Sequence, residues 1–236
     1  MDDSSVISLG QRERNKRDKL LRIKNAAQEL FVSKGYDDTT TREIAVRAGV
    51  GMGTVFTYAN NKRDLLFLIA NEDLKEITRK AESDISPDAS LMTNVLAIFR
   101  NHYEFYSRQP ELSRLMLREM LFYDSGQQAN QFKTTREKLM SLICEAVRFA
   151  QLNKTVRTSE DARTIGWMLF CIYQVESRNW LSEANLDLKE GLDRHAHLLR
   201  ICLAGVGPKD IALVLSEPAE TERRAAGVPS RTKQRR

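Results

Sequence analysis

Apolar residues recur at intervals of three and four along most of the chain, and this spacing predicts helices. The first such segment places five apolar residues on one helix face: Leu20, Ile23, Ala27, Leu30 and Phe31. Gly35 follows as a helix C-terminal stop. No stretch of useful length alternates apolar and polar residues as a strand does. The sequence therefore predicts an all-α chain of about nine helices.

Capping residues and helix breakers divide the rest of the chain. Two short helices are expected between Thr40 and Tyr58. Longer ones are expected at about residues 61–83, 88–107, 110–121, 126–151, 159–182 and 188–205. Asn61 caps the first of these, Ser86-Pro87-Asp88 opens the second, and Thr158 or Ser159 caps the helix at 159–182.

The length of 236 residues is enough to bury a core without disulfides. The longest apolar run, residues 165–173, is far shorter than the roughly 18 residues of a membrane span. The polar N-terminus is not a secretory signal, so we expect a cytoplasmic protein with no membrane partner. Cys144, Cys171 and Cys202 fit neither a disulfide framework nor a zinc site, and buried reduced thiols are expected.

Positive charge lies at the two ends of the chain, whose formal net charge is +5. Residues 12–24 are strongly basic, which suits a phosphate backbone, although a solvated helix start has the same composition. We divide the chain into a basic flexible arm (1–18), a first helical segment (19–66), a longer helical body (67–207) and a disordered tail (208–236).

The segment from Ile44 to Tyr58 has the residue pattern of a helix-turn-helix. A small residue, Ala45, stands where the two helices meet, and Gly49 supplies the turn four positions later. Apolar residues fill the angle between the helices: Ile44, Ala48, Val50 and Val55. Thr40 and Glu43 form a capping box ahead of the motif. The alternative is an ordinary helical hairpin, which does not need all of these residues together.

On these residues, the stretch from about Lys19 to Leu66 resembles the DNA-binding domain of the tetracycline-repressor (TetR) family. The matching segments are Ala26-Ala27-x-x-Leu30-Phe31, Lys34-Gly35-Tyr36, Thr39-Thr40-x-x-x-Ile44-Ala45, Ala48-Gly49-Val50, Gly53-Thr54-Val55-Phe56 and Lys62-x-Asp64-Leu65-Leu66. They cover about a fifth of the chain, and the expected helix count agrees with the family. The resemblance implies that residues 19–66 are a DNA-binding domain and residues 67–207 a ligand-binding and dimerisation domain.

The resemblance implies that the second helix of the motif lies in the DNA major groove. The residues that it assigns to DNA contact are Thr40, Gly51, Met52, Thr54, Thr57, Tyr58 and Lys62. Thr40, Tyr58 and Lys62 would hold phosphates, whereas Met52 and Thr57 would contact bases. Gly51 and Met52 replace a serine and a lysine that are usual in the family, so this recognition helix is weakly polar.

The helix at 159–182 is apolar on all sides, so it must be covered on more than one side. Either it and the last helix are central helices of one core, or they pack against a second subunit. The resemblance implies the latter, a four-helix dimer interface. The expected interface residues are Met168, Ile172, Val175, His195, Leu198, Leu199 and Cys202.

Aromatic residues and methionines gather between positions 99 and 132, where ordinary core packing explains most of them. Family members bind small apolar or aromatic molecules between these helices, so some residues are expected to line a cavity. The expected cavity residues are Phe99, Asn101, His102, Tyr103, Met116, Met120, Phe132, Trp167 and Gln174.

The sequence thus predicts a homodimeric transcriptional regulator that binds a double-stranded DNA operator. We expect a repressor that an unidentified small apolar or aromatic effector releases from the operator. No catalytic residues, metal ligands or cofactor are expected, because His195 and His197 point to different sides of a helix and no nucleophile grouping stands out. The alternative is a constitutive nucleoid- or division-associated helix-turn-helix protein without a ligand.

Overall fold

The computed structural model describes residues 3–156 and 158–205, and within them it contains nine α-helices, one 3-10 helix and no strand. The prediction of an all-α fold is confirmed. Residues up to Leu199 form one unit, and a second begins at Arg200. The tail expected to be disordered, 208–236, lies outside the described residues.

Three helices make the N-terminal domain: α1 (Asp3–Ser33), α2 (Thr41–Arg47) and α3 (Met52–Phe56). The buried faces of α1 and α2 meet around Ile23, Phe31 and Ile44, and Leu65 and Leu66 of the next helix close this core. Gly35 and Gly49 have φ values of +95° and +62°, so both expected glycine turns are present.

Helix α1 begins earlier than the sequence analysis expects. Residues 3–18, assigned to a flexible arm, belong to the same helix as residues 19–33. The analysis relied on an apolar stripe, which starts only at Leu20. Residues 11–17 are mostly Arg, Lys, Glu and Gln, which favour helix through their own propensity, and residues 10–18 are exposed.

The remaining helices form a bundle: α4 (Lys62–Asp84), α5 (Leu91–Arg108), α6 (Pro110–Glu119), the 3-10 helix η1 (Met120–Phe122), α7 (Ala129–Leu152), α8 (Ala162–Leu181) and α9 (Leu188–Ala204). Asn61 caps α4, as expected. Two other expected helix starts are wrong. Ser90 caps α5, whereas Ser86 to Ala89 form a turn before it, and Asp161 caps α8 in place of Thr158 or Ser159.

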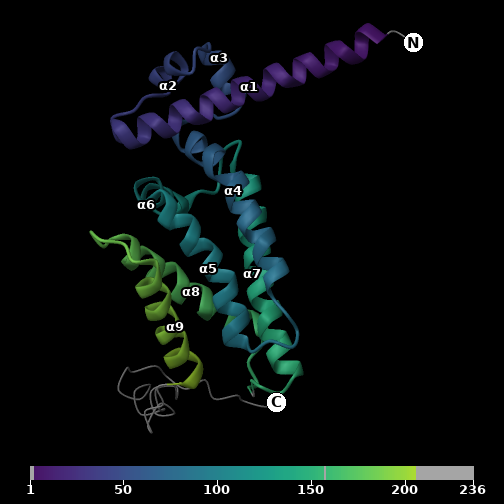
Figure 1. The fold of residues 1–236 in the computed structure, drawn as a ribbon, viewed down its shortest axis with the longest axis vertical. Helices are drawn as coiled ribbons and strands as arrows, with labels where there is room; N and C mark the ends of the chain where they lie inside the picture. The colour runs from purple at the N-terminus through teal and green to yellow at the C-terminus, as the bar shows by residue number, and fades with distance from the viewer. Residues whose placement is uncertain (1–2, 157, 206–236) are drawn as a thin grey trace, which may run out of the picture. The chain divides into compact units, whose positions relative to one another are not determined.

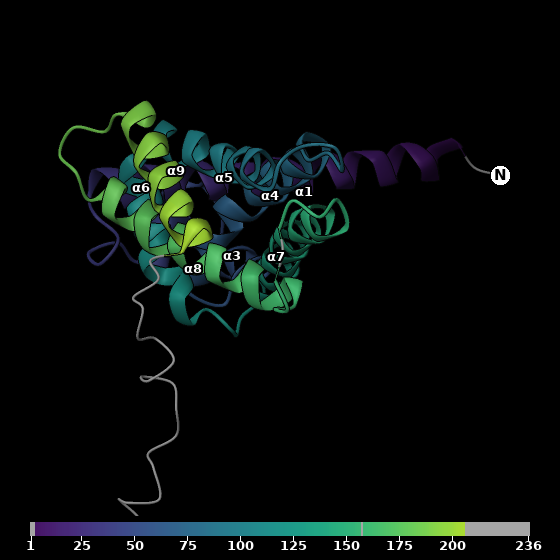
Figure 2. The same ribbon diagram turned by 90° about the horizontal axis from the view of Figure 1, so that it is seen from below.

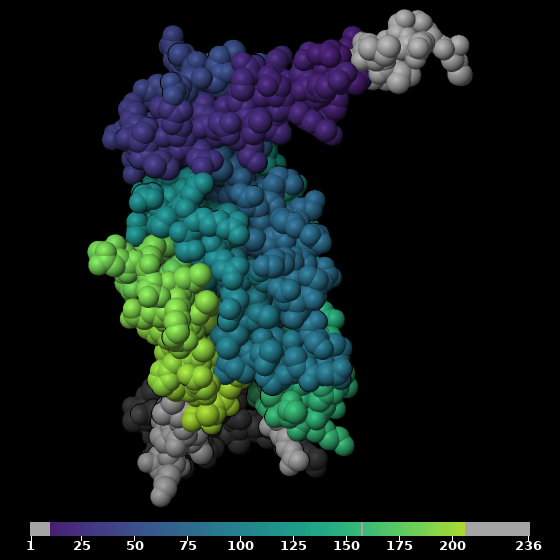
Figure 3. All heavy atoms as spheres, viewed as in Figure 1, coloured from purple at the N-terminus to yellow at the C-terminus, as the bar shows by residue number. Residues whose placement is uncertain are grey.

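Helix α4 joins the two domains. It begins under the helix-turn-helix and then packs along α5 and α7, while α6 contacts both α1 and α8 (Figure 1). The surface of the N-terminal domain adjoins the surfaces of α4 and α6 (Figure 3). Both α4 and α6 therefore pack directly against α1 of the N-terminal domain.

Helix α8 lies between α7 and α9 (Figure 2). The buried Trp180 donates a hydrogen bond to the Asp187 carbonyl at 2.9 Å, and a Cβ at Gly191 would lie 2.6 Å from its ring. Arg194 forms ion pairs with Glu176 and Glu183. These contacts fix α9 on α8 within one subunit.

Candidate DNA-binding surface and effector cavity

The N-terminus of α2 carries the expected capping box. The Thr40 hydroxyl accepts a hydrogen bond from Glu43 N at 3.2 Å, and the Glu43 carboxylate accepts one from Thr40 N at 2.9 Å. Lys34 also donates to Glu43 and, together with the Thr40 bonds, lowers the pKa of Glu43 to about 2. Thr40 is exposed, as a phosphate contact requires, and a carboxylate already occupies the adjacent helix end.

Helix α3 turns its polar and small residues outward. Gly51, Thr57 and the apolar Phe56 are exposed, Met52 and Thr54 are half-buried, and Val55 is buried against the domain core. Gly51 caps α3 without any side-chain hydrogen bond, as its substitution for serine predicts. The structure thus leaves Met52, Thr54 and Thr57 accessible on the recognition helix, and their contact with DNA stays a prediction.

The two residues expected to hold phosphates beyond α3 already have partners within the domain. The Tyr58 hydroxyl donates to the Lys16 carbonyl in α1 at 3.2 Å. The Lys62 ammonium donates to the carbonyls of Tyr36 and Asp37 at 2.6 and 3.0 Å. Both side chains therefore brace the domain, and their phosphate contacts stay predictions.

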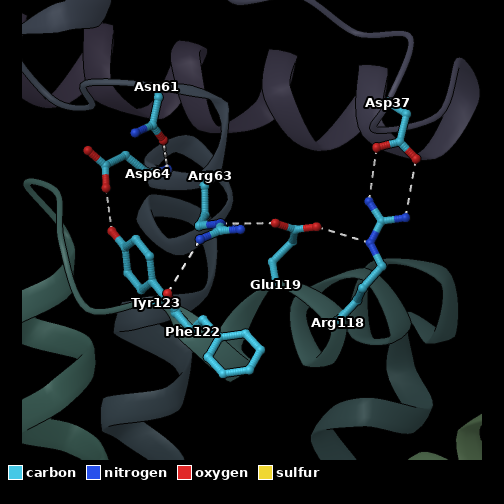
Figure 4. A network of polar contacts seen from close by, with 8 residues as sticks. All are labelled: Asp37, Asn61, Arg63, Asp64, Arg118, Glu119, Phe122 and Tyr123. Carbon is cyan, nitrogen blue, oxygen red and sulfur yellow. Dashed lines mark hydrogen bonds and ion pairs between the residues drawn. The ribbon is translucent and has the colours of Figure 1, made fainter.

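A polar network that the sequence analysis missed joins this domain to the segment after α6 (Figure 4). Arg118 pairs with both carboxylate oxygens of Asp37 at 3.1 and 3.2 Å, and Glu119 bridges Arg118 and Arg63 at 3.0 Å each. Arg118 and Asp37 are exposed, so this pair contributes little to stability. The pair instead holds the α1–α2 loop in position against the end of α6.

The second half of the network centres on Asp64, whose side chain is fully buried. Asp64 accepts hydrogen bonds from the Tyr123 hydroxyl and from the backbone N–H groups of Asn60 and Gln127, the last two at 2.9 and 3.0 Å. Burial, followed by the bond to Asp64, raises the pKa of Tyr123, so its hydroxyl stays a donor. Asp64 belongs to the TetR-like segment, but nothing in the sequence connects it to Tyr123.

An apolar cavity of about 50 Å³ lies between α4, η1, α5, α7 and α8. Four expected residues line it: His102, Met120, Phe132 and Gln174. The other lining residues are Leu74, Thr78, Tyr106, Leu121, Thr135, Arg136, Leu139, Phe170 and Tyr173. The Arg136 guanidinium stands 5.5 Å from the Phe170 ring centre. The cavity thus combines apolar walls with a few polar groups, as ligand sites do.

Five other residues expected in the cavity lie elsewhere. Phe99 and Tyr103 are packed into the core, where Phe99 stacks on Tyr173 and Tyr103 contacts Trp180. Asn101 donates to Asp84, and Met116 lines a separate hollow of about 180 Å³ between α4, α5 and α6. Trp167 points outward with 52% of its surface exposed. Helical periodicity identified the apolar residues here but not which of them surround empty space.

Two buried histidines stand near the cavity. His102 Nδ1 donates a hydrogen bond to the Ile98 carbonyl at 3.2 Å, while neither ring nitrogen of His195 has a partner among the described residues. Burial lowers the pKa of each imidazole from 6.5 to about 4. His195 packs edge-on against Phe99 and is fully buried within the single subunit, and its place in the dimer interface stays a prediction.

Acid should therefore destabilise the fold between pH 6.5 and pH 4. In this range the unfolded chain binds protons that the folded chain excludes, so stability is complete above pH 6.5 and falls as pH drops. Below pH 4, each histidine lowers the free energy of unfolding by about 3 kcal/mol relative to its value above pH 6.5. Chemical denaturation at several pH values measures how much the free energy of unfolding falls. His195→Leu should reduce this fall, with His197→Leu, an exposed position on α9, as the control. An unchanged pH dependence in His195→Leu would contradict this assignment.

The outer face of α8 is apolar and exposed. Trp167, Met168, Cys171 and Val175 lie along one stripe of the helix, and Val175 is 62% exposed. Ile172 and Leu198 are half-buried, Cys202 is intermediate, and Leu199 is fully buried in its own subunit. Cys171 is exposed, whereas a buried thiol was expected, and the interface role of the buried Leu199 stays a prediction. The surplus apolar face itself is present, although it is formed chiefly by α8.

No helix in the described part of the chain is long and apolar enough to cross a membrane. Among the same residues, no group of His, Cys, Asp or Glu side chains is arranged to hold a metal ion.

The family model of the bacterial regulatory proteins of the tetR family matches residues 23–69 of this chain. The fatty acid metabolism regulator protein of Bacillus subtilis is 28% identical over 100 residues, 42% of this chain and 52% of that protein. The transcriptional repressor KstR of Mycobacterium tuberculosis is 24% identical over 199 residues, 84% of this chain and 85% of that protein. The chain spans about half, or less, of the length of the first curated relatives that it matches.

A solved structure extends the similarity to the helical body. Thermus thermophilus FadR, a TetR family transcriptional repressor crystallised with lauroyl-CoA, is 26% identical and superposes with a TM-score of 0.60. The match covers 80% of this chain and 95% of that one. The matched segment at 23–69 contains the capped helix-turn-helix, and the helices that follow share the fold of a full-length relative. Residues 23–69 thus match the tetR family, and the chain shares its fold with Thermus thermophilus FadR over 80% of its length.

Proposed function

We propose that the protein is a dimeric repressor that leaves its operator when a fatty acyl-CoA binds in the apolar cavity. The observation that carries the proposal is this cavity, enclosed by α4, α5, α7 and α8 and lined by both apolar and polar groups. The lauroyl-CoA complex of Thermus FadR supports the effector class. A constitutive DNA-binding protein would have no use for such a cavity.

The small volume of the cavity favours an effector-free state of the protein over an effector-bound one. About 50 Å³ holds a few water molecules, whereas ligand sites usually measure roughly 300–1,000 Å³. An acyl chain can enter only if the surrounding helices separate. We therefore interpret the closed cavity as the effector-free, DNA-binding state, so effector and DNA favour different conformations.

An entrance is available on the outer face of α4 and α7. A groove of about 910 Å³ lies between these helices, and Thr78 and Thr135 line both the groove and the cavity. Separation of α4 from α7 at these two threonines would open a continuous path. It would also displace α4, whose first turn lies beneath the recognition helix.

The apolar stripe on α8 supports the dimer. A stripe that includes Trp167, Met168 and Val175 is costly to leave in water, and a second copy of the same helix would cover it. Two recognition helices would then enter successive major grooves, with half-sites about one turn, roughly 10 bp, apart.

The experiment selects duplexes from random DNA with the full chain and measures operator binding by fluorescence anisotropy. We expect a palindromic site, and lauroyl-CoA should weaken binding about 5–150-fold, the usual range of allosteric coupling. Coenzyme A without an acyl chain is the control and should leave binding unchanged. Equal release by both compounds, or by neither, would contradict the proposed effector.

A cavity-filling variant tests the site itself. Leu139→Trp adds bulk where Leu139 lines the cavity, so lauroyl-CoA should release the operator at least tenfold less effectively. Operator affinity without effector should stay within about threefold, because the closed state is retained. Met140→Trp, half-buried beside it but outside the cavity lining, is the matched control. A wild-type response from Leu139→Trp would place the effector elsewhere.

A further inference from the structure

We propose that Gln127 and Gln128 are positioning residues that set the orientation of recognition helix α3 without touching DNA. They also transmit the opening of the cavity to that helix. This second role rests on the proposed function, whereas the first does not. We call residues 120–128, from η1 to the start of α7, the connector.

The two glutamine side chains donate hydrogen bonds to the end of the recognition helix. Gln127 Nε2 donates to the Phe56 carbonyl at 2.9 Å and to Asn60 Oδ1 at 2.7 Å. Gln128 Nε2 donates to the Tyr58 carbonyl at 2.9 Å. The last carbonyls of a helix have no partner within it, so these amides satisfy groups that would otherwise need water. The direction in which α3 ends is thereby fixed by the connector.

Both glutamines are themselves held in place. Asn71 Nδ2, on α4, donates to the Gln128 backbone carbonyl at 3.1 Å and to its side-chain Oε1 at 3.3 Å, which orients the amide. Buried Asp64 accepts the Gln127 backbone N–H and the Tyr123 hydroxyl. Arg63 also donates to the Phe122 carbonyl, so three residues of α4, namely Arg63, Asp64 and Asn71, hold the connector in place (Figure 4).

The other end of the connector forms part of the cavity wall. Met120 and Leu121 line the cavity, and Tyr123, which bonds to Asp64, follows directly after Phe122. An effector that enlarges the cavity must push on Met120 and Leu121. Fewer than ten residues separate them from Gln127 and Gln128, so the displacement reaches the carbonyls of Phe56 and Tyr58 directly. A rotation of α4 would also act on α3, through the linker at residues 57–61 and the hydrogen bond from Asn60 N to Asp64.

The test compares Gln127→Ala/Gln128→Ala with Gln151→Ala in the full chain. Gln151 is a matched control, because its amide on α7 also donates to a backbone carbonyl, that of Glu160, at 2.9 Å. The first readout is hydrogen exchange of the amides in residues 52–61, without DNA or effector. We expect at least tenfold faster exchange in the double variant and wild-type exchange in the control. Wild-type exchange in the double variant would overturn the positioning role.

The second readout is the release ratio, the operator Kd with lauroyl-CoA divided by the Kd without it. A purely structural role would lower operator affinity equally in both states and leave this ratio unchanged. We expect the double variant to show a ratio below about threefold. A wild-type ratio would overturn the transmission role. If lauroyl-CoA fails to release the wild type, the proposed effector fails, and the exchange measurement still decides the positioning role.

Discussion

Replacement of Gly126 by alanine should lower the free energy of unfolding by about 3–5 kcal/mol, a large part of a typical total of roughly 5–15 kcal/mol. Gly126 has a φ of +127°, a conformation that costs any other residue about 1–3 kcal/mol. An added Cβ would also collide with Asp64, lying 2.8 Å from its Cγ and closer still to one carboxylate oxygen. Overpacking adds a penalty of roughly 1–3 kcal/mol.

The collision falls on the residue that holds the connector, so DNA binding should suffer as well. Operator affinity of Gly126→Ala should drop at least tenfold even at temperatures where the variant is folded. Urea denaturation and anisotropy measure the two effects. Gly35→Ala separates strain from collision, because Gly35 also has a positive φ but nothing within 4 Å of an added Cβ. Equal losses in both variants would show that the contact with Asp64 is unimportant.

Val175→Glu should give a folded monomer that has lost at least 100-fold in operator affinity. In one subunit Val175 is 62% exposed, so a carboxylate there costs the isolated fold little. Across a dimer interface the same carboxylate would be buried without a partner, which is expensive. A monomer also loses the gain from two linked recognition helices, which commonly reaches 10²–10⁴-fold.

Sedimentation velocity measures the subunit state, and circular dichroism checks the fold. Leu152→Glu is the matched control, since Leu152 is 77% exposed at the end of α7, away from the α8 stripe. It should remain dimeric and bind the operator normally. A fully dimeric Val175→Glu would remove α8 from the interface. Substitution of the buried Leu199 would not serve here, because it would damage the subunit core itself.

Local signals in the sequence predicted the helix-turn-helix of the N-terminal domain well. The capping box at Thr40, the turn at Gly49 and the core contacts of Ile44 and Val55 depend on residues within a few positions of one another. Constraints between neighbouring residues appear as fixed spacings in the sequence, so they can be predicted from it. The early start of α1 escaped notice because a helix without a buried face has no periodicity.

The long-range contacts could not be predicted in the same way. Asp64 and Tyr123 are 59 positions apart, and Gln127 reaches a carbonyl 71 positions away. Neither pair has a spacing or residue type that indicates its partner. For the cavity, apolar periodicity gives the inward face of each helix but not the points at which packing is incomplete. Phe99 and Phe132 have the same chemistry, yet only Phe132 borders empty space.

The central claim is that operator DNA and effector favour opposite states of one cavity, and thermodynamic linkage allows a direct test. If lauroyl-CoA weakens operator binding by a given factor, the operator must weaken lauroyl-CoA binding by the same factor. The decisive measurement is calorimetric titration of lauroyl-CoA into the protein alone and into its operator complex. The account predicts a loss of effector affinity equal to the release ratio, about 5–150-fold. The same effector affinity with and without DNA would contradict it.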